Sequence, residues 1–149
     1  MFRLLSDTEV LLNELLVTCR ESVDHYQDAI NLVEKPEIGS SFQAIANQRK
    51  LFCKRLAEAI RELGDLPSVP DPDKETGAMI IHHLGAALSP DYTNEVLTQR
   101  IAAEEHILEL IGKARELKES EFCAALLNDL SKHARETLGI LSNARTTAH

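Results

Sequence analysis

Residues 42–63 read FQAIANQRKLFCKRLAEAIREL and decide the fold class. Apolar side chains recur in this stretch every three or four residues, the spacing that places them on one side of an α-helix. Gly64 follows and can take the left-handed conformation that ends many helices. Arg49 falls within the apolar stripe, where an amphipathic helix normally turns only hydrophobic residues toward its neighbours. The stretch therefore predicts a long amphipathic helix that carries one charge into a helical core.

The same periodicity predicts three further long helices. The first begins at the capping box Ser6-Asp7-Thr8-Glu9, and its stripe continues almost to Pro36, which opens the next helix. Ser89-Pro90 starts another helix, and a short break near residues 117–120 precedes the last. The expected inward residues are Leu12, Leu15 or Leu16, Cys19, Ser22 or Val23, Tyr26, Ile30 and Val33; Phe42, Ile45, Arg49, Phe52 or Cys53, Leu56, Ile60 and Leu63; Val96 or Leu97, Ile101, Glu104, Leu108, Ile111 and Arg115; Phe122 or Cys123, Leu126, Leu130, His133, Thr137 and Ile140 or Leu141.

The connections between these helices set the expected topology. The first and last connections are short, so each pair of helices is expected to form an antiparallel hairpin. Residues 64–89 are long enough to run the length of the bundle, and a short helix is expected at residues 76–88. The expected fold is a single all-α domain over residues 1–149, a ferritin-like four-helix bundle whose two hairpins are joined by a long crossover. An up-and-down bundle is the alternative, if the short helix only covers one end.

The composition argues against several classes of function. A net charge of -8 opposes binding to nucleic acid or to an anionic membrane, and no basic patch counters it. The longest apolar run is too short to span a bilayer, and the N-terminal residues lack a secretory signal pattern, so the expected location is the cytoplasm. The three cysteines have no C-x-x-C spacing and are expected to be small buried hydrophobic residues.

Counting along the helices places four polar residues at one height. Arg49 and Glu104 lie at similar distances from the starts of two helices that the crossover makes parallel, so their side chains can touch. Tyr26 and His133 reach the same level from the other two helices. The sequence therefore predicts a structural polar layer in which the Arg49 guanidinium neutralises the Glu104 carboxylate.

Ferritin-type bundles hold metal at this level, so the side chains available as ligands decide whether this chain can bind a metal there. A di-metal carboxylate site needs a Glu on each of two helices and a Glu-x-x-His pair on each of the other two. The sequence contains no E-x-x-H, and residues 48–50 supply Gln, Arg and Lys where ligands belong. We therefore expect no catalytic residue and no metal. The alternative is a divergent iron or manganese site with Glu21, Glu104 and His133 as ligands.

The remaining histidines have weaker functional readings. The reversed pair His106-x-x-Glu109 lies about opposite Glu104 on the helical wheel, which predicts surface residues. His25 lies four residues after Glu21, and the two are expected to make a solvated contact. The side chains of the adjacent His82 and His83 would point about 100° apart on a helix, so both cannot easily bind one metal ion. The function we assign to them is incidental binding of metal at the surface.

Several stretches make the chain similar to a known family. They are Leu-Leu-Val-Thr-Cys-Arg-Glu at residues 15–21, Tyr26 and Ala29, the Phe42 to Phe52 segment with Gln48-Arg49, and Ala103-Glu104-Glu105. With these the chain resembles a bacterial family of ferritin-like four-helix-bundle domains of unknown function. The resemblance covers most of the chain and implies a ferritin-like fold without an assigned activity. Tyr26, Arg49 and Glu104 belong to the family pattern, whereas Ile111 stands where the family has an aromatic residue.

Three hypotheses of function follow. The first is a non-enzymatic helical bundle without cofactor, with a homodimer as the candidate assembly, that contacts a protein partner in a role such as stress adaptation. The second is a divergent metal oxidase or metal store that uses the alternative ligands. The third is a binder of an apolar small molecule between the helices, beside Cys19 or Cys53, because bundle cores can host such ligands.

Overall fold

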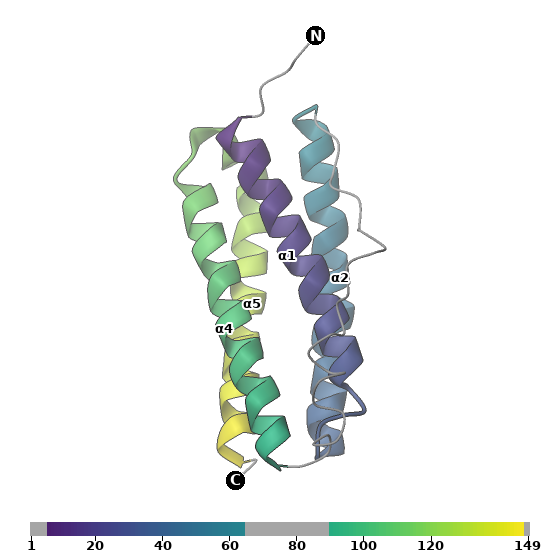
Figure 1. Cartoon of the computed structure of the whole chain (residues 1–149). Helices are drawn as coiled ribbons and strands as arrows, with labels where there is room; N and C mark the ends of the chain where they lie inside the picture. Colours follow the sequence, from purple (N-terminus) through teal and green to yellow (C-terminus); the bar gives the residue numbers. More distant parts are fainter. Residues whose placement is uncertain (1–5, 65–89, 148–149) are drawn as a thin grey trace.

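The computed structural model describes residues 6–64 and 90–147, which form four long α-helices and one short 3-10 helix, with no strand in these ranges. The elements are α1 Asp7–Ala29, α2 Pro36–Glu62, α4 Pro90–Arg115, η2 Lys118–Cys123 and α5 Ala124–Thr147. Figure 1 shows the long helices side by side as a bundle, so the predicted all-helical bundle is confirmed for the described residues. The expected crossover and its helix at residues 76–88 lie outside them. By length and hydropathy, no described helix qualifies as a candidate membrane span.

The ends of the first two helices follow from local sequence chemistry. Ser6 Oγ accepts from the Glu9 backbone N–H at 3.2 Å, while the Glu9 carboxylate accepts from the Ser6 N–H at 3.3 Å, so the predicted capping box is confirmed. Pro36 is the first residue of α2, where its missing N–H costs nothing. Gly64 has a φ of 84°, which only glycine adopts freely, and it ends α2 as predicted.

The first helix ends earlier than its apolar stripe predicts. The stripe was expected to continue almost to Pro36, but α1 stops at Ala29 and the chain turns through residues 30–35. Pro36 disfavours helical geometry only in the residue before it, and Lys35 is accordingly extended, with φ -96° and ψ 128°, which separates the turn from α2. The connection is tied to the other hairpin, because the Glu34 N–H donates to Thr93 Oγ1 at 2.9 Å.

The four long helices form a ring in which each packs against two neighbours. The close pairs are α1 with α2, α4 with α5, α1 with α4, and α2 with α5. The pairs α2 with α4 and α1 with α5 therefore lie on the two diagonals. Figure 1 shows that α2 and α4 run in the same direction, opposite to α1 and α5. A contact between α2 and α4 must consequently cross the centre of the bundle.

The core is divided into two apolar clusters along the bundle axis. One cluster joins buried residues from 12–19, 52–60, 107–114 and 123–134, and the other joins residues from 23–33, 38–46 and 92–97 with Leu141. Each cluster thus draws on one half of every long helix. Arg49 and Glu104, both fully buried, fall between the two groups on their helices. The charged residues therefore separate two hydrophobic ends of one bundle.

Helix α4 is rotated relative to the predicted stripe. Ile101 and Leu108 were expected to face inward but are only half-buried, and Arg115 is exposed and donates to Asn128 Oδ1 at 2.6 Å. The positions that are buried instead are Arg100, Ile107 and Ala114. The helix packs between α1 and α5, so its buried arc is wide and its centre is not fixed by periodicity alone.

Gly39 provides a test of how closely α2 approaches the end of α1. A Cβ at this position would lie 2.7 Å from the carbonyl oxygen of Ile30, so the backbone must shift to accept a methyl group. We expect Gly39→Ala to lower the free energy of unfolding by roughly 1–3 kcal/mol, measured by urea denaturation. Gly139→Ala is the matched control, because that site is open and helical, and we expect it to gain about 0.5–1 kcal/mol. A stabilising Gly39→Ala would refute the close approach.

Candidate functional site

The centre of the bundle is an ion pair between Arg49 on α2 and Glu104 on α4. Arg49 Nη2 donates to Glu104 Oε1 at 2.6 Å, and Nη1 donates to Oε2 at 3.1 Å. Two parallel hydrogen bonds of this kind match the planar guanidinium to the planar carboxylate. Both side chains are 0% exposed, so the pair is removed from water. The two charges that interrupt the predicted stripes therefore meet across the diagonal of the bundle.

The other two helices complete the hydrogen bonding of this pair. From α1, the Tyr26 hydroxyl donates to Glu104 Oε2 at 2.8 Å, and Ser22 Oγ accepts from Arg49 Nη1 at 3.1 Å. From α5, His133 Nδ1 accepts from Arg49 Nε at 3.3 Å. We call these five residues, one or two from each long helix, the polar layer. All four predicted members belong to it, while the part played by Ser22 is an addition from the structure.

Burial and the pairing together set the protonation states of the layer. Burial alone would lower the pKa of Arg49, but the Glu104 carboxylate raises it above its usual value, so the guanidinium stays charged. Burial, and then the Glu104 charge, raise the pKa of Tyr26 well above 10, which keeps its proton on the hydroxyl. The layer is therefore a cation, an anion and neutral donors and acceptors at neutral pH.

His133 is held as a neutral ring with a defined tautomer. A guanidinium can only donate, so the Nδ1 atom that faces Arg49 must present its lone pair, and the ring proton sits on Nε2. Burial, and then the Arg49 charge, lower the pKa of His133 to about 4. The ring also stacks on Phe52, with 5.3 Å between the ring centroids. Neither ring nitrogen is then free to coordinate a metal ion.

A second buried arginine, Arg100 on α4, was not anticipated from the sequence. It is 6% exposed, and its Nη2 lies 2.8 Å from His25 Nδ1. The guanidinium lies over the Tyr26 ring at 5.5 Å from the centroid, a cation–π contact. Burial lowers the pKa of Arg100, and Arg100 Nε has no hydrogen-bond partner within the described residues. The His25 ring is half-buried against Arg100 rather than fully solvated, and Glu21 remains one of its charged neighbours, as expected from their spacing.

The signal for Arg100 was present in the sequence. It precedes Glu104 by four residues, which places the two on the same face of a helix. Periodicity favoured the neighbouring Ile101 because an apolar residue fits a stripe better than a charged one. The contact of His25 with Arg100 joins two helices and leaves no local pattern.

The layer does not fit a metal ion. Both Glu104 oxygens already accept hydrogen bonds, and the His133 lone pair is turned to Arg49. In residues 6–64 and 90–147, no three His, Cys, Asp or Glu side chains are grouped so that they could hold a metal ion. The alternative iron or manganese set, which adds Glu21, is therefore not assembled there.

His106 and Glu109 are 49% and 61% exposed, as predicted for surface residues, while His82 and His83 lie outside the described residues.

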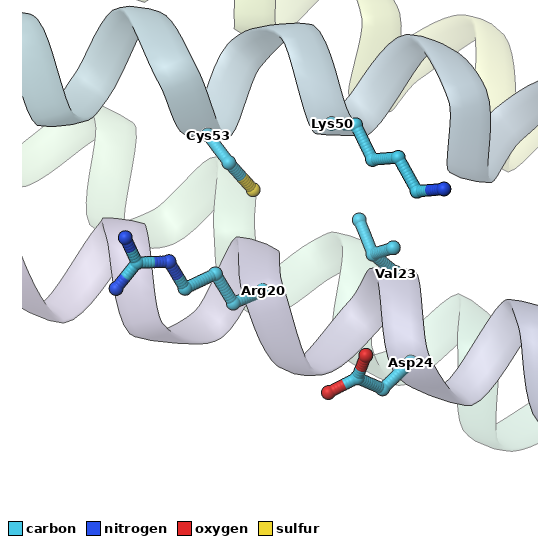
Figure 2. A pocket seen from close by; sticks show the side chains of 5 residues that line it. All are labelled: Arg20, Val23, Asp24, Lys50 and Cys53. Atoms are coloured by element: carbon cyan, nitrogen blue, oxygen red, sulfur yellow. The ribbon is translucent and has the colours of Figure 1, made fainter. Parts of the chain in front are cut away.

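One pocket lies beside Cys53, between α1 and α2. Its volume is about 250 Å³, and the residues that line it are Arg20, Val23, Asp24, Lys50 and Cys53. Figure 2 shows the Cys53 sulfur and the Val23 side chain pointing into the space between the two helices. Burial raises the pKa of Cys53 to about 11, so the thiol is protonated at neutral pH and a poor nucleophile. Cys19 and Cys123 are buried, as predicted.

Comparison with known proteins gives a family but no activity. The chain matches the family described as Domain of unknown function (DUF2383) over residues 7–117. The matched range includes Tyr26, Arg49 and Glu104 and ends before α5, which carries His133. No curated protein and no solved structure matches the chain.

The ion pair makes a sharp prediction about single and double replacements. Arg49→Met leaves the Glu104 carboxylate buried without its cation, and we expect a loss of roughly 3–5 kcal/mol in the free energy of unfolding. The apolar double variant Arg49→Met/Glu104→Met removes both charges and should be far milder, as measured by urea denaturation. If the two single losses simply add in the double variant, the pair contributes no coupling and the interpretation fails.

Proposed function

We propose, from the premise that this chain belongs to the DUF2383 family, that it is a non-enzymatic, ferritin-like helical bundle that acts by binding a protein through one face. In this proposal the Arg49 guanidinium takes the position at which a ferritin-type bundle carries metal. The observation that carries it is that every side-chain nitrogen and carboxylate oxygen of the buried ion pair has a hydrogen-bond partner, while both side chains are 0% exposed. Charged groups that are paired with one another and removed from solvent are not placed to meet a substrate.

The seam between α2 and α5 supports a binding role. Three hollows follow one another along it, with volumes of about 220, 220 and 320 Å³. Phe122 lines the first and is 45% exposed, and Ile140 lines the other two and is 43% exposed. Leu51, 64% exposed, lies one helical turn from lining residues on α2. We call this surface the α2–α5 face; apolar side chains gathered on one exposed face are typical of an interaction site.

We take a second copy of this chain as the occupant of the α2–α5 face. A twofold axis across the seam would place the Phe122 end of one copy against the Ile140 end of the other. Each end carries both signs of charge, Lys35 and Glu37 at the Ile140 end and Arg55, Glu58 and Glu62 at the Phe122 end. In the antiparallel order, basic and acidic side chains can therefore pair at both ends of the contact.

Metal loading tests the first part of the proposal. We expect protein purified without a His tag and exposed to iron(II) and manganese(II) to retain much less than one ion per chain, measured by elemental analysis. Glu104→Gln is the informative variant, because it keeps the shape of the side chain and should leave the metal content unchanged. Stoichiometric metal that is lost in Glu104→Gln or Glu104→Ala would overturn the proposal in favour of a metal site.

Self-association tests the second part. We expect the wild-type chain to sediment as a dimer at micromolar concentration and Leu51→Glu/Ile140→Glu to sediment as a folded monomer, because two charges would be buried in the contact. Val10→Glu on α1 is the matched control, since Val10 is 48% exposed and lies outside the α2–α5 face. A wild-type monomer, or equal loss of dimer in Val10→Glu, would contradict the chosen occupant.

A further inference from the structure

Each of the two buried arginines contacts the Nδ1 atom of its own histidine. Arg49 Nε donates to His133 Nδ1 at 3.3 Å, and Arg100 Nη2 lies 2.8 Å from His25 Nδ1. The arginines are 0% and 6% exposed, whereas both imidazole rings are half-buried. The two contacts use different helices, α2 with α5 and α4 with α1. The same chemical arrangement therefore occurs twice around the polar layer.

This arrangement requires neutral histidines. A guanidinium has five N–H donors and no acceptor, so each Nδ1 must offer a lone pair. A proton added at Nδ1 turns the acceptor into a donor, which removes the hydrogen bond and sets an imidazolium directly against a guanidinium. With both rings protonated, each buried arginine would face an imidazolium in place of a neutral acceptor.

The charged side chains near the two histidine rings do not change the conclusion that both rings are neutral. Around His133 they are Arg49 from α2, Glu104 from α4 and Glu136 from α5 itself; the arginine disfavours the charged ring and the two acids favour it. Burial has the largest effect, and the net result is a pKa lowered from 6.5 to about 4.

Burial and the neighbouring charges change the pKa of His25 in the same direction as that of His133. Arg100 from α4 disfavours the charged ring, while three acids on α1 favour it, namely Glu21, Asp24 and Asp28. Burial again has the largest effect, and the pKa of His25 is lowered from 6.5. Both rings therefore take up a proton less readily in the folded chain than in the unfolded one.

We propose that His25 and His133 form an acid-sensitive latch: in the neutral state each holds a buried arginine, and protonation of both releases the arginines and opens the bundle at the polar layer. The polar layer lies between the two apolar clusters, so loss of its hydrogen bonds separates the two ends of the core. Protons can reach His133 through the hollow of about 220 Å³ that it lines between α2 and α5. The proposal does not depend on the dimer or on the absence of metal.

The direction of the pH effect follows from linkage. Because the folded pKa of each ring lies below its unfolded value of 6.5, the unfolded chain binds more protons in the interval between them. Stability contributed by the neutral rings is thus fully present above pH 6.5. It is lost as the pH falls, for His133 down to about pH 4.

The test compares urea unfolding of the wild-type chain and of His25→Asn/His133→Asn from about pH 7.5 to about pH 4.5. An asparagine amide oxygen can accept from an arginine near the position of Nδ1 but does not titrate. Below about pH 6.5 we expect the wild-type unfolding constant to rise, relative to the variant, by up to about tenfold per pH unit for each histidine. His106→Asn is the matched control, because His106 is exposed and faces the Glu109 carboxylate at 3.9 Å.

Two results would overturn the latch. One is a ratio of unfolding constants that does not change with pH, or a His106→Asn variant that flattens the profile as much as the double variant. The other is independent of any variant and so holds even if the double variant fails to fold. Nitrogen-15 NMR of the wild-type rings at neutral pH should show His25 and His133 protonated on Nε2, and a proton on Nδ1 of either ring would contradict the proposed geometry.

Discussion

The bidentate hydrogen bond between Arg49 and Glu104 is the interaction on which the rest of the bundle depends. It joins the diagonal helices α2 and α4, which do not otherwise pack closely, and so all four long helices must stay within reach of one point. Removing both charges from water costs several kcal/mol per ion, and their attraction offsets this cost only where the geometry is good and further hydrogen bonds satisfy the remaining donors and acceptors. Ser22, Tyr26 and His133 supply the remaining partners, which makes the ion pair a shared constraint rather than a local contact.

This constraint gives the bundle a register that its apolar clusters cannot specify. Leu, Ile and Ala side chains pack against one another in many offsets, and a slip of one helical turn, about 5.4 Å, changes their packing only modestly. The same slip at the polar layer would leave a buried charge without its partner, at a cost of roughly 3–5 kcal/mol. The layer therefore excludes the alternative alignments, even if the pair itself adds little net stability over an apolar replacement.

Periodicity was sufficient to predict the bundle and the two charges at its centre, because both depend on which residues share a helical face. The capping box at Ser6 and the glycine at Gly64 marked helix ends correctly, since these rest on local backbone chemistry. Periodicity failed where the burial of a residue depends on how a neighbouring helix packs. The rotation of α4 buries Arg100 in place of Ile101, and the contact of Arg100 with His25 has no counterpart in local spacing. The open seam between α2 and α5 likewise depends on how closely two helices approach.

Two guanidiniums, Arg49 in the polar layer and Arg100 beside it, share one buried carboxylate, and this imbalance explains why a histidine lies next to each arginine. A second buried acid near Arg100 would neutralise it, but would also carry the desolvation cost of another ion. A neutral imidazole instead offers a hydrogen-bond acceptor without adding a charge, and it can remain half-exposed, because its uncharged form does not need full solvation. The solution holds only while the ring is unprotonated. A bundle that uses histidine to satisfy buried arginines therefore ties its own alignment to the proton concentration around it, whereas an acid in the same position would lose its effect only at lower pH, as the carboxylate is protonated.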